Sequence, residues 1–351
     1  MNERLLGCPV VNQVVVKDDL LLPFLPYEEL DAEKLGERAE RLADNLASVR
    51  DVTEACGGQF LYVTLPCQYA VFSSEYPDWL NNRAELTALS CGSLFLALDE
   101  RKVDWLDLGE LLLQPGTRDR ATLRTDNHFS MFGAYLTYRA VVQHINKSRS
   151  QPLAVLEPGE FTLRTLPNPF LGSRSRKLFA LDGLPERLSI FEPLQPVPFR
   201  RWGNGALLAP EVYALPASEE EPVDYNTLYM GGDYAETVIQ TGREELPSVL
   251  IYGDSFTNAV ECMLYYSFGR MHSLDLRYYR QQSLGEYIEA YRPDYVICLR
   301  DYEQSSSPWD NGGPAFPAAG SADEETGAAP KAGRTYLPET KAGAAAERRA
   351  D

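Results

Sequence analysis

The sequence predicts an α/β fold built around a mainly parallel β-sheet. Continuous apolar runs at residues 60–65, 249–252 and 295–299 are typical of strands that are buried on both faces. Segments with helical spacing of apolar residues lie beside these runs along the chain. Because parallel neighbours need crossover connections, this alternation indicates strands joined by right-handed crossovers.

The first third of the chain supplies one helix and one core strand. Residues 1–26 are strand-like, with valines at positions 10–11 and 14–16. Asp31 can cap a helix whose apolar residues recur at helical spacing, and Gly57-Gly58 ends it. The strand at 60–65 follows, and Pro66 terminates it. A helix that leads into a core strand is typical of an α/β arrangement.

The middle of the chain changes character. A second helix is predicted from about Ser130 to Ile145. Residues 151–218 are rich in Pro, Gly and short β-branched runs, and they show no long helical period. We interpret residues 151–245 as an irregular, β-rich insertion between two α/β parts.

The α/β pattern returns at Ser248. A strand at 249–252, a tight turn at 253–255 and a helix from Phe256 follow one another, and then come a strand at 273–277, a helix at 285–291 and the strand at 295–299. From residue 304 onward Ser, Gly, Ala, Pro and charged residues dominate, too few apolar anchors to offset the entropy of ordering. We therefore expect one folded domain at 1–303 and a disordered, low-complexity tail at 304–351.

Composition excludes several classes of protein. The chain has 33 basic and 51 acidic residues, a net charge of −18, which disfavours nucleic acid and anionic membrane surfaces as partners. We find no apolar run of membrane-spanning length and no signal peptide. The six cysteines form no CxxC pair, so we expect buried thiols rather than a zinc ribbon or a redox motif.

Ser255 is the candidate nucleophile. It follows an apolar strand and opens a helix, so its N–H and Oγ lie where a helix N-terminus favours developing negative charge. Gly253 permits the sharp turn. The alternative is that Ser255 only caps the helix while Asp254 ends the strand.

His128 and Asp126 are the candidate base and its partner. A nucleophilic serine needs a base, usually histidine, and an acidic group sets the tautomer of that histidine. Side chains two residues apart in an extended or turn segment point the same way. The alternative is a Thr-Asp-Asn helix cap beside a surface His128. The other two histidines, His144 and His272, are interpreted as structural.

Other catalytic motifs are missing from the sequence. It has no Walker loop, no GxGxxG after a strand, no HExxH, no EF-hand loop and no GxSxG elbow. The sequence therefore implies no cofactor and no metal, and the ordinary α/β-hydrolase interpretation lacks its main motif.

Two segments resemble the DHHW family, which is similar to the bacterial alginate O-acetyltransferases with an SGNH-hydrolase-like domain. Residues 124–135, RTDNHFSMFGAY, resemble the family's Thr-Asp-x-His-aromatic motif and its Gly-Ala-Tyr, and residues 249–256, VLIYGDSF, resemble its nucleophile block. Shorter matches lie at 62–66, 170–173, 229–233 and 293–297, in a consistent order from about 20 to 302. The family's second His-Trp pair is replaced by Asn127 and Phe129. The family usually begins with a membrane anchor, which we do not find in this chain.

The resemblance implies a three-layer sandwich of SGNH-hydrolase type in a permuted order, with Asp-x-His before Ser. It implies Ser255 as nucleophile, His128 as base and Asp126 as the residue that orients the base. Asn258 and Arg300 are further candidates for holding the oxyanion or the substrate. The ordinary alternative for both is solvated packing or a surface ion pair.

The expected function is therefore acyl-ester chemistry through a serine. The resemblance suggests an O-acetyltransferase, or an acetylesterase, that acts on a cell-surface polysaccharide outside the bacterial cytoplasm. Its partners would be that polysaccharide and an acetyl donor, which a membrane acyltransferase could supply. The alternative is a non-catalytic carbohydrate-binding or assembly protein on an SGNH-like fold.

Overall fold

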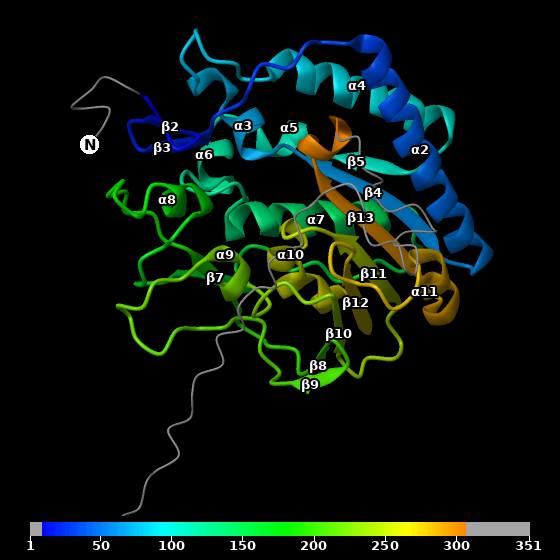
Figure 1. The fold of residues 1–351 in the computed structure, drawn as a ribbon. Coiled ribbons are helices and arrows are strands. Elements are labelled where there is room, and N and C mark those ends of the chain that lie inside the picture. The colour runs from blue at the N-terminus through cyan, green and yellow to red at the C-terminus, as the bar shows by residue number, and fades with distance from the viewer. Residues whose placement is uncertain (1–8, 307–351) are drawn as a thin grey trace, which may run out of the picture. The chain divides into compact units, whose positions relative to one another are not determined.

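A central eight-stranded sheet organises the protein, whose computed structural model describes residues 9–306 (Figure 1). In spatial order its strands are β5 (Trp105–Asp107), β4 (Gln59–Leu65), β13 (Tyr295–Asp301), β11 (Ser248–Gly253), β12 (Arg270–Asp275), β10 (Glu236–Gln240), β8 (Arg200–Gly203) and β9 (Ala206–Leu208). The strands from β5 to β12 are parallel to one another, and β10, β8 and β9 continue the sheet in antiparallel fashion. The predicted mainly parallel sheet is confirmed.

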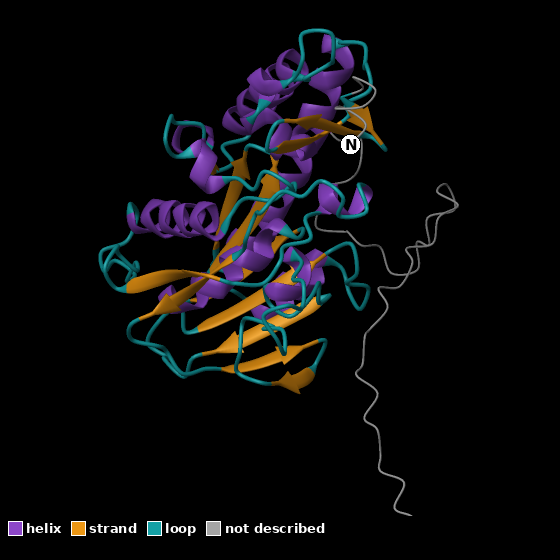
Figure 2. Ribbon diagram, turned by 90° about the vertical axis from the view of Figure 1, so that its left-hand side faces the viewer, coloured by secondary structure: helices purple, strands orange, loops and turns teal. Residues whose placement is uncertain are grey.

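Helices cover both faces of this sheet (Figure 2). One face packs against α2 (Ala32–Ala55), α4 (Ala84–Glu100) and α11 (Leu284–Tyr291), and the other against α7 (Met131–Asn146) and α10 (Phe256–Leu264). Successive residues of a strand alternate between these two cores, so Tyr62 faces α2 while Val63 faces α7. The continuous apolar runs of the parallel strands follow from this double burial.

The register of the parallel strands brings their carboxyl ends to one edge. Gly253 at the end of β11 pairs with Leu299 of β13, and Asp301 at the end of β13 pairs with Leu65 of β4. In open α/β sheets the crevice beyond the carboxyl ends of the strands is where sites form.

Smaller elements surround the sheet. The N-terminal strands β1 (Val10–Val11), β2 (Val14–Lys17) and β3 (Leu20–Pro23) form a separate antiparallel sheet, as β6 (Phe161–Thr165) and β7 (Ser189–Pro193) do. The short helices are α3 (Gln68–Val71), η1 (Ser73–Glu75), α5 (Gly109–Leu112), α6 (Arg118–Ala121), α8 (Ser173–Lys177), α9 (Tyr225–Leu228), η2 (Tyr265–Ser267) and η3 (Tyr302–Ser306).

The insertion at 151–245 is β-rich as predicted, but it does more than separate two α/β parts. It supplies β6 and β7, two short helices, and the antiparallel strands β8, β9 and β10 that extend the central sheet. The insertion is therefore part of the main sheet and of the layer beyond its carboxyl edge.

Several expectations need correction. The helix at 84–100 was not predicted, because its packed face includes Thr87, Ser90 and Cys91 while Leu96 is exposed, which blurs the apolar stripe. The strand expected at 273–277 lies at 270–275. The expected tail begins too early, because Ser305 is buried within η3; the rest of that tail, from residue 307, lies outside the described residues.

Two further findings concern cysteines and membranes. The cysteines between residues 9 and 306 are free thiols, buried except for the partly exposed Cys56, while Cys8 lies outside the described residues. Within that same part of the chain, no helix combines the length and apolar character needed to cross a membrane.

Candidate active site

The turn after β11 presents Ser255. An added Cβ on Gly253 would lie 2.5 Å from the carbonyl oxygen of Leu299, so only glycine lets the turn approach β13 this closely. Ser255 is the N-cap residue of α10, yet its side chain makes no capping hydrogen bond. Ser255 therefore occupies the N-cap position, but its hydroxyl contacts His128 instead of capping the helix.

A tight loop presents Asp126 and His128. Hydrogen bonds from Leu123 N to His128 O (3.1 Å) and from Ser130 N to Ala121 O (2.7 Å) close the loop at its base. Asp126 lies in the part of the loop beyond these bonds. The cap of α7 is Ser130, whose Oγ accepts from the Gly133 N–H. The Thr-Asp-Asn segment is thus not the cap of that helix, and His128 is buried rather than on the surface.

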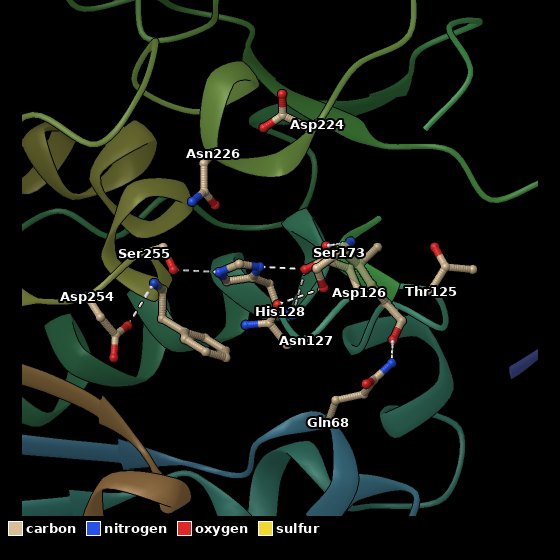
Figure 3. A network of polar contacts seen from close by, with 12 residues as sticks. Gln68, Thr125, Asp126, Asn127, His128, Ser173, Asp224, Asn226, Asp254 and Ser255 are labelled. Carbon is tan, nitrogen blue, oxygen red and sulfur yellow. Dashed lines mark hydrogen bonds and ion pairs between the residues drawn. The ribbon is translucent and has the colours of Figure 1, made fainter. Parts of the chain in front are cut away.

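The three candidate residues form one hydrogen-bonded line (Figure 3). His128 Nδ1 lies 2.5 Å from Asp126 Oδ1, and His128 Nε2 lies 2.7 Å from Ser255 Oγ. Asp126, His128 and Ser255 are 1%, 4% and 8% exposed. When the Nδ1–H group donates a hydrogen bond to the Asp126 carboxylate, the imidazole keeps its proton on Nδ1. Nε2 is then free to accept the proton of the serine hydroxyl.

The electrostatics keep Asp126 ionised. Burial by itself would raise the pKa of Asp126, but the electrostatic interaction with the adjacent His128 ring and hydrogen bonds from His128 and the Ser173 N–H hold this pKa well below its usual range. The Ser173 N–H donates to Oδ2 at 2.6 Å, so the two carboxylate oxygens have separate partners. The carboxylate is therefore fixed in orientation by partners on both of its oxygens.

Packing fixes the His128 ring in its plane. The ring stacks on Tyr225 of α9, with centroids 3.9 Å apart and an interplanar angle of 5°, and it contacts Phe256 at 4.9 Å. Tyr225 and Ser173 both come from the insertion. Neither was predicted as a site residue: Ser173 lies in a segment matched only by resemblance, and nothing local marks Tyr225.

The loop is also held from beneath by Gln68 of α3. Its Nε2 lies 3.1 Å from both Leu21 O and Leu123 O, which ties β3, α3 and the loop together. On the side of α8, Gly172 packs so closely that an added Cβ would lie 2.3 Å from Thr125 O. Segments far apart in the sequence therefore converge on one loop.

Asn258 and Arg300 lie close to the turn that carries Ser255, but each has a partner of its own. Asn258 Nδ2 donates to Asp233 Oδ1 at 2.8 Å, and Asn226 Nδ2 donates to the other oxygen of Asp233 at 3.0 Å. Arg300 Nη1 lies 3.8 Å from Asp254 Oδ2, and both side chains are largely buried. The ion pair of Arg300, which the alternative interpretation put at the surface, is thus buried.

The remaining histidines lie elsewhere. His144 Nε2 pairs with Asp104 at 3.0 Å, and His272 Nδ1 contacts the Tyr287 hydroxyl at 2.5 Å. Neither is hydrogen-bonded to Ser255 or Asp126. Between residues 9 and 306, no group of three or more His, Cys, Asp or Glu residues is arranged to hold a metal ion.

Comparison with known proteins gives one family and several structures. The family model described as "SGNH hydrolase-like domain, acetyltransferase AlgX" matches residues 24–200. No curated protein sequence matches the chain.

Three solved structures illustrate the likeness in fold. PatB1 of Bacillus cereus with a sulfonyl adduct has a TM-score of 0.68 and 21% identity, over 84% of this chain and 96% of that one. A DHHW family protein from Eubacterium siraeum has a TM-score of 0.62 and 17% identity, over 87% of this chain and 95% of that one. The O-acetyltransferase domain of Pseudomonas putida AlgJ has a TM-score of 0.50 and 17% identity, over 84% of this chain and 92% of that one. The expected SGNH-hydrolase-like fold is confirmed.

Proposed function

Since this chain belongs to the family of SGNH hydrolase-like domains of the acetyltransferase AlgX, we propose that it is a serine-dependent O-acetyltransferase or acetylesterase. The resemblance to the DHHW and alginate O-acetyltransferase proteins is confirmed by the family model and by the structural neighbours. Membership in a family of acetyltransferases supports an enzymatic activity for this chain. The assignment of the residues that carry out the reaction is our proposal.

The observation that supports this proposal is the hydrogen-bonded line Asp126–His128–Ser255. Ser255 Oγ attacks the acetyl carbonyl while His128 Nε2 takes its proton, and Asp126 stabilises the resulting imidazolium. In this proposal the Ser255 N–H, at the N-terminus of α10, holds the oxyanion. When the tetrahedral intermediate collapses, His128 returns the proton to the leaving alcohol and an acetyl-serine remains.

The second half of the reaction reverses these roles. An acceptor hydroxyl gives its proton to His128 and attacks the acetyl-serine, which releases the acetylated acceptor and restores the Ser255 hydroxyl. A sugar hydroxyl as acceptor gives transfer, and water gives hydrolysis. We propose a cell-surface polysaccharide as acceptor, a separate acetyl donor, and a location at the cell envelope outside the cytoplasm.

A sulfonyl fluoride probe tests the nucleophile, because such reagents sulfonylate activated serines and the Bacillus cereus neighbour carries a sulfonyl adduct. We expect stoichiometric labelling of the wild type, located at Ser255 by mass spectrometry, and none of Ser255→Ala. With an activated acetyl ester, Ser255→Ala and His128→Ala should each lower kcat by about 10³-fold or more, and Asp126→Asn by somewhat less.

His144→Ala and His272→Ala are the matched controls for a general effect of removing a histidine, and we expect kcat close to wild type for both. A wild type that neither reacts with the probe nor hydrolyses the ester would contradict the proposal. It would favour the non-catalytic carbohydrate-binding protein on the same fold.

A further inference from the structure

The tip of the Asp126–His128 loop has backbone donors that the loop itself does not satisfy. The closing bonds involve Leu123 N and Ser130 N, whereas the N–H groups of Arg124 and Thr125 lie beyond them. Thr125 is only 2% exposed. Buried backbone N–H groups need an acceptor, because leaving one unpaired costs about as much as a lost hydrogen bond, roughly 1–3 kcal/mol.

Glu186 supplies these acceptors from the insertion, between α8 and β7. Its Oε1 accepts from Arg124 N at 2.6 Å, and its Oε2 accepts from Thr125 N at 2.9 Å and from Thr125 Oγ1 at 2.5 Å. All three groups that converge on Glu186 are donors. A carboxylate, which only accepts, suits this position, whereas the amide group of a glutamine would turn a donor toward a donor.

The opposite side of Thr125 is also held. Its carbonyl oxygen accepts from the backbone N–H of Arg174 in α8 at 3.1 Å, and the close packing of Gly172 leaves no room for the loop to shift that way. Thr125 is covalently joined to Asp126, whose Oδ1 lies 2.5 Å from His128 Nδ1. A movement of Thr125 would therefore be passed directly to the carboxylate that orients the histidine.

We propose that Glu186 is a positioning residue of the reaction, which holds Asp126 and His128 in line with Ser255 through Thr125. This inference rests on the proposed function. Glu186 touches none of the reacting atoms, so its loss should slow the chemical step and leave binding of a small acetyl ester unchanged. Misplacement of catalytic groups by about 1 Å can cost about 10²-fold in rate.

The test measures the rate of sulfonyl fluoride labelling and the kcat and KM for an acetyl ester. The labelling rate and kcat are expressed per folded molecule, with the folded fraction determined by circular dichroism. Glu186→Gln should lower the labelling rate and kcat by about ten-fold or more, with KM changed less than about two-fold. Thr125→Val, which removes only the hydroxyl donor, should lower them by about three-fold or more. The double variant should lose less than the product of the two single losses, because both act through one contact.

Glu192→Gln is the matched control. It makes the same change of charge in the same insertion, at an exposed ion pair with Arg164, and should label at the wild-type rate. If Glu186→Gln and Thr125→Val label like wild type, or if their losses multiply independently, the inference is wrong. If Glu186→Gln does not fold, the Thr125→Val rate alone decides between these outcomes. A wild type that is not labelled at all removes the proposed function and this inference with it.

Discussion

At the scale of single residues, the three histidines illustrate how surroundings decide what an imidazole can do. His128 has a carboxylate on one nitrogen and a serine hydroxyl on the other. His272 stacks on Tyr291 at 3.5 Å, and its Nδ1 meets the hydroxyl of Tyr287, which itself donates to Glu236. Burial and the nearby positive charge of Arg270 lower the pKa of His272 to about 3.

This depressed pKa predicts a loss of stability in mild acid. The unfolded chain binds a proton at His272 below about pH 6.5, whereas the folded protein resists it, so the contribution is present above pH 6.5 and is lost as pH falls toward 3. We expect His272 to account for a loss on the order of 2 kcal/mol in the free energy of unfolding between pH 7 and pH 5.

Urea unfolding at pH 7 and pH 5 checks this prediction. His272→Phe loses the hydrogen bond to Tyr287 and should be less stable than wild type at pH 7, but its further loss at pH 5 should be smaller. Equal pH slopes for the two proteins would show that His272 is not the group responsible.

At the scale of elements, the position of α7 depends on a close approach to the loop that carries His128. An added Cβ on Gly133, in the first turn of α7, would lie 2.3 Å from Ala121 O and 2.8 Å from Phe129 Cβ. Ala121 and Phe129 flank the loop at its base. The glycine therefore sets the distance between the helix and the loop.

Gly133→Ala should lower stability by about 1–3 kcal/mol, the usual cost of overpacking, and should reduce ester hydrolysis because the loop must move. Gly92→Ala in α4 is the matched control, since nothing lies within 4 Å of its added Cβ. That change should stabilise the protein by about 0.5–1 kcal/mol and leave kcat unchanged. Urea unfolding and ester kinetics on both variants provide the comparison, and a Gly133→Ala protein as active and stable as wild type would contradict it.

At the scale of the whole molecule, the described residues converge from four regions on the carboxyl edge of the sheet. The loop at 121–130, the turn at 253–255, helix α3 and the insertion each contribute. Beyond the last strand, η3 packs on α4: Ser305 is 2% exposed and donates to Tyr302 O, and the Tyr302 hydroxyl donates to Asp107 at 2.6 Å. The packed part of the fold thus extends past the end of β13 and includes η3.

A pair of truncations checks where the folded part ends. A chain that stops at residue 301 loses the contacts of η3 and should melt about 5–10 °C lower than the full chain. A chain that stops at residue 306 should melt within about 2 °C of the full chain, because the composition of the remainder predicts no packing. Differential scanning calorimetry measures both melting temperatures. If the chain that stops at residue 301 melted at the same temperature as the chain that stops at residue 306, η3 would not be part of the stable fold.

Local signals were sufficient for much of the fold. Asp31 caps α2 as its position predicts, and the apolar runs at 60–65, 249–252 and 295–299 lie in β4, β11 and β13. These predictions depend only on neighbours a few residues away, because caps, helical periodicity and continuous apolar runs are local properties. The same is true of the two motifs that contain Asp126, His128 and Ser255.

Contacts between distant segments could be seen only in the tertiary structure. Local pattern could not tell whether Ser255 caps a helix or meets His128, 127 positions away. Nor could it place Tyr225 on the His128 ring or Glu186 beneath Thr125. Such residues carry no local mark, because a stacking ring or a partly buried carboxylate takes its role from residues that lie far from it in the sequence. The sequence therefore indicated the main buried strands, several helices and the chemical groups of the site, and the packing of the insertion against the sheet decided which groups meet.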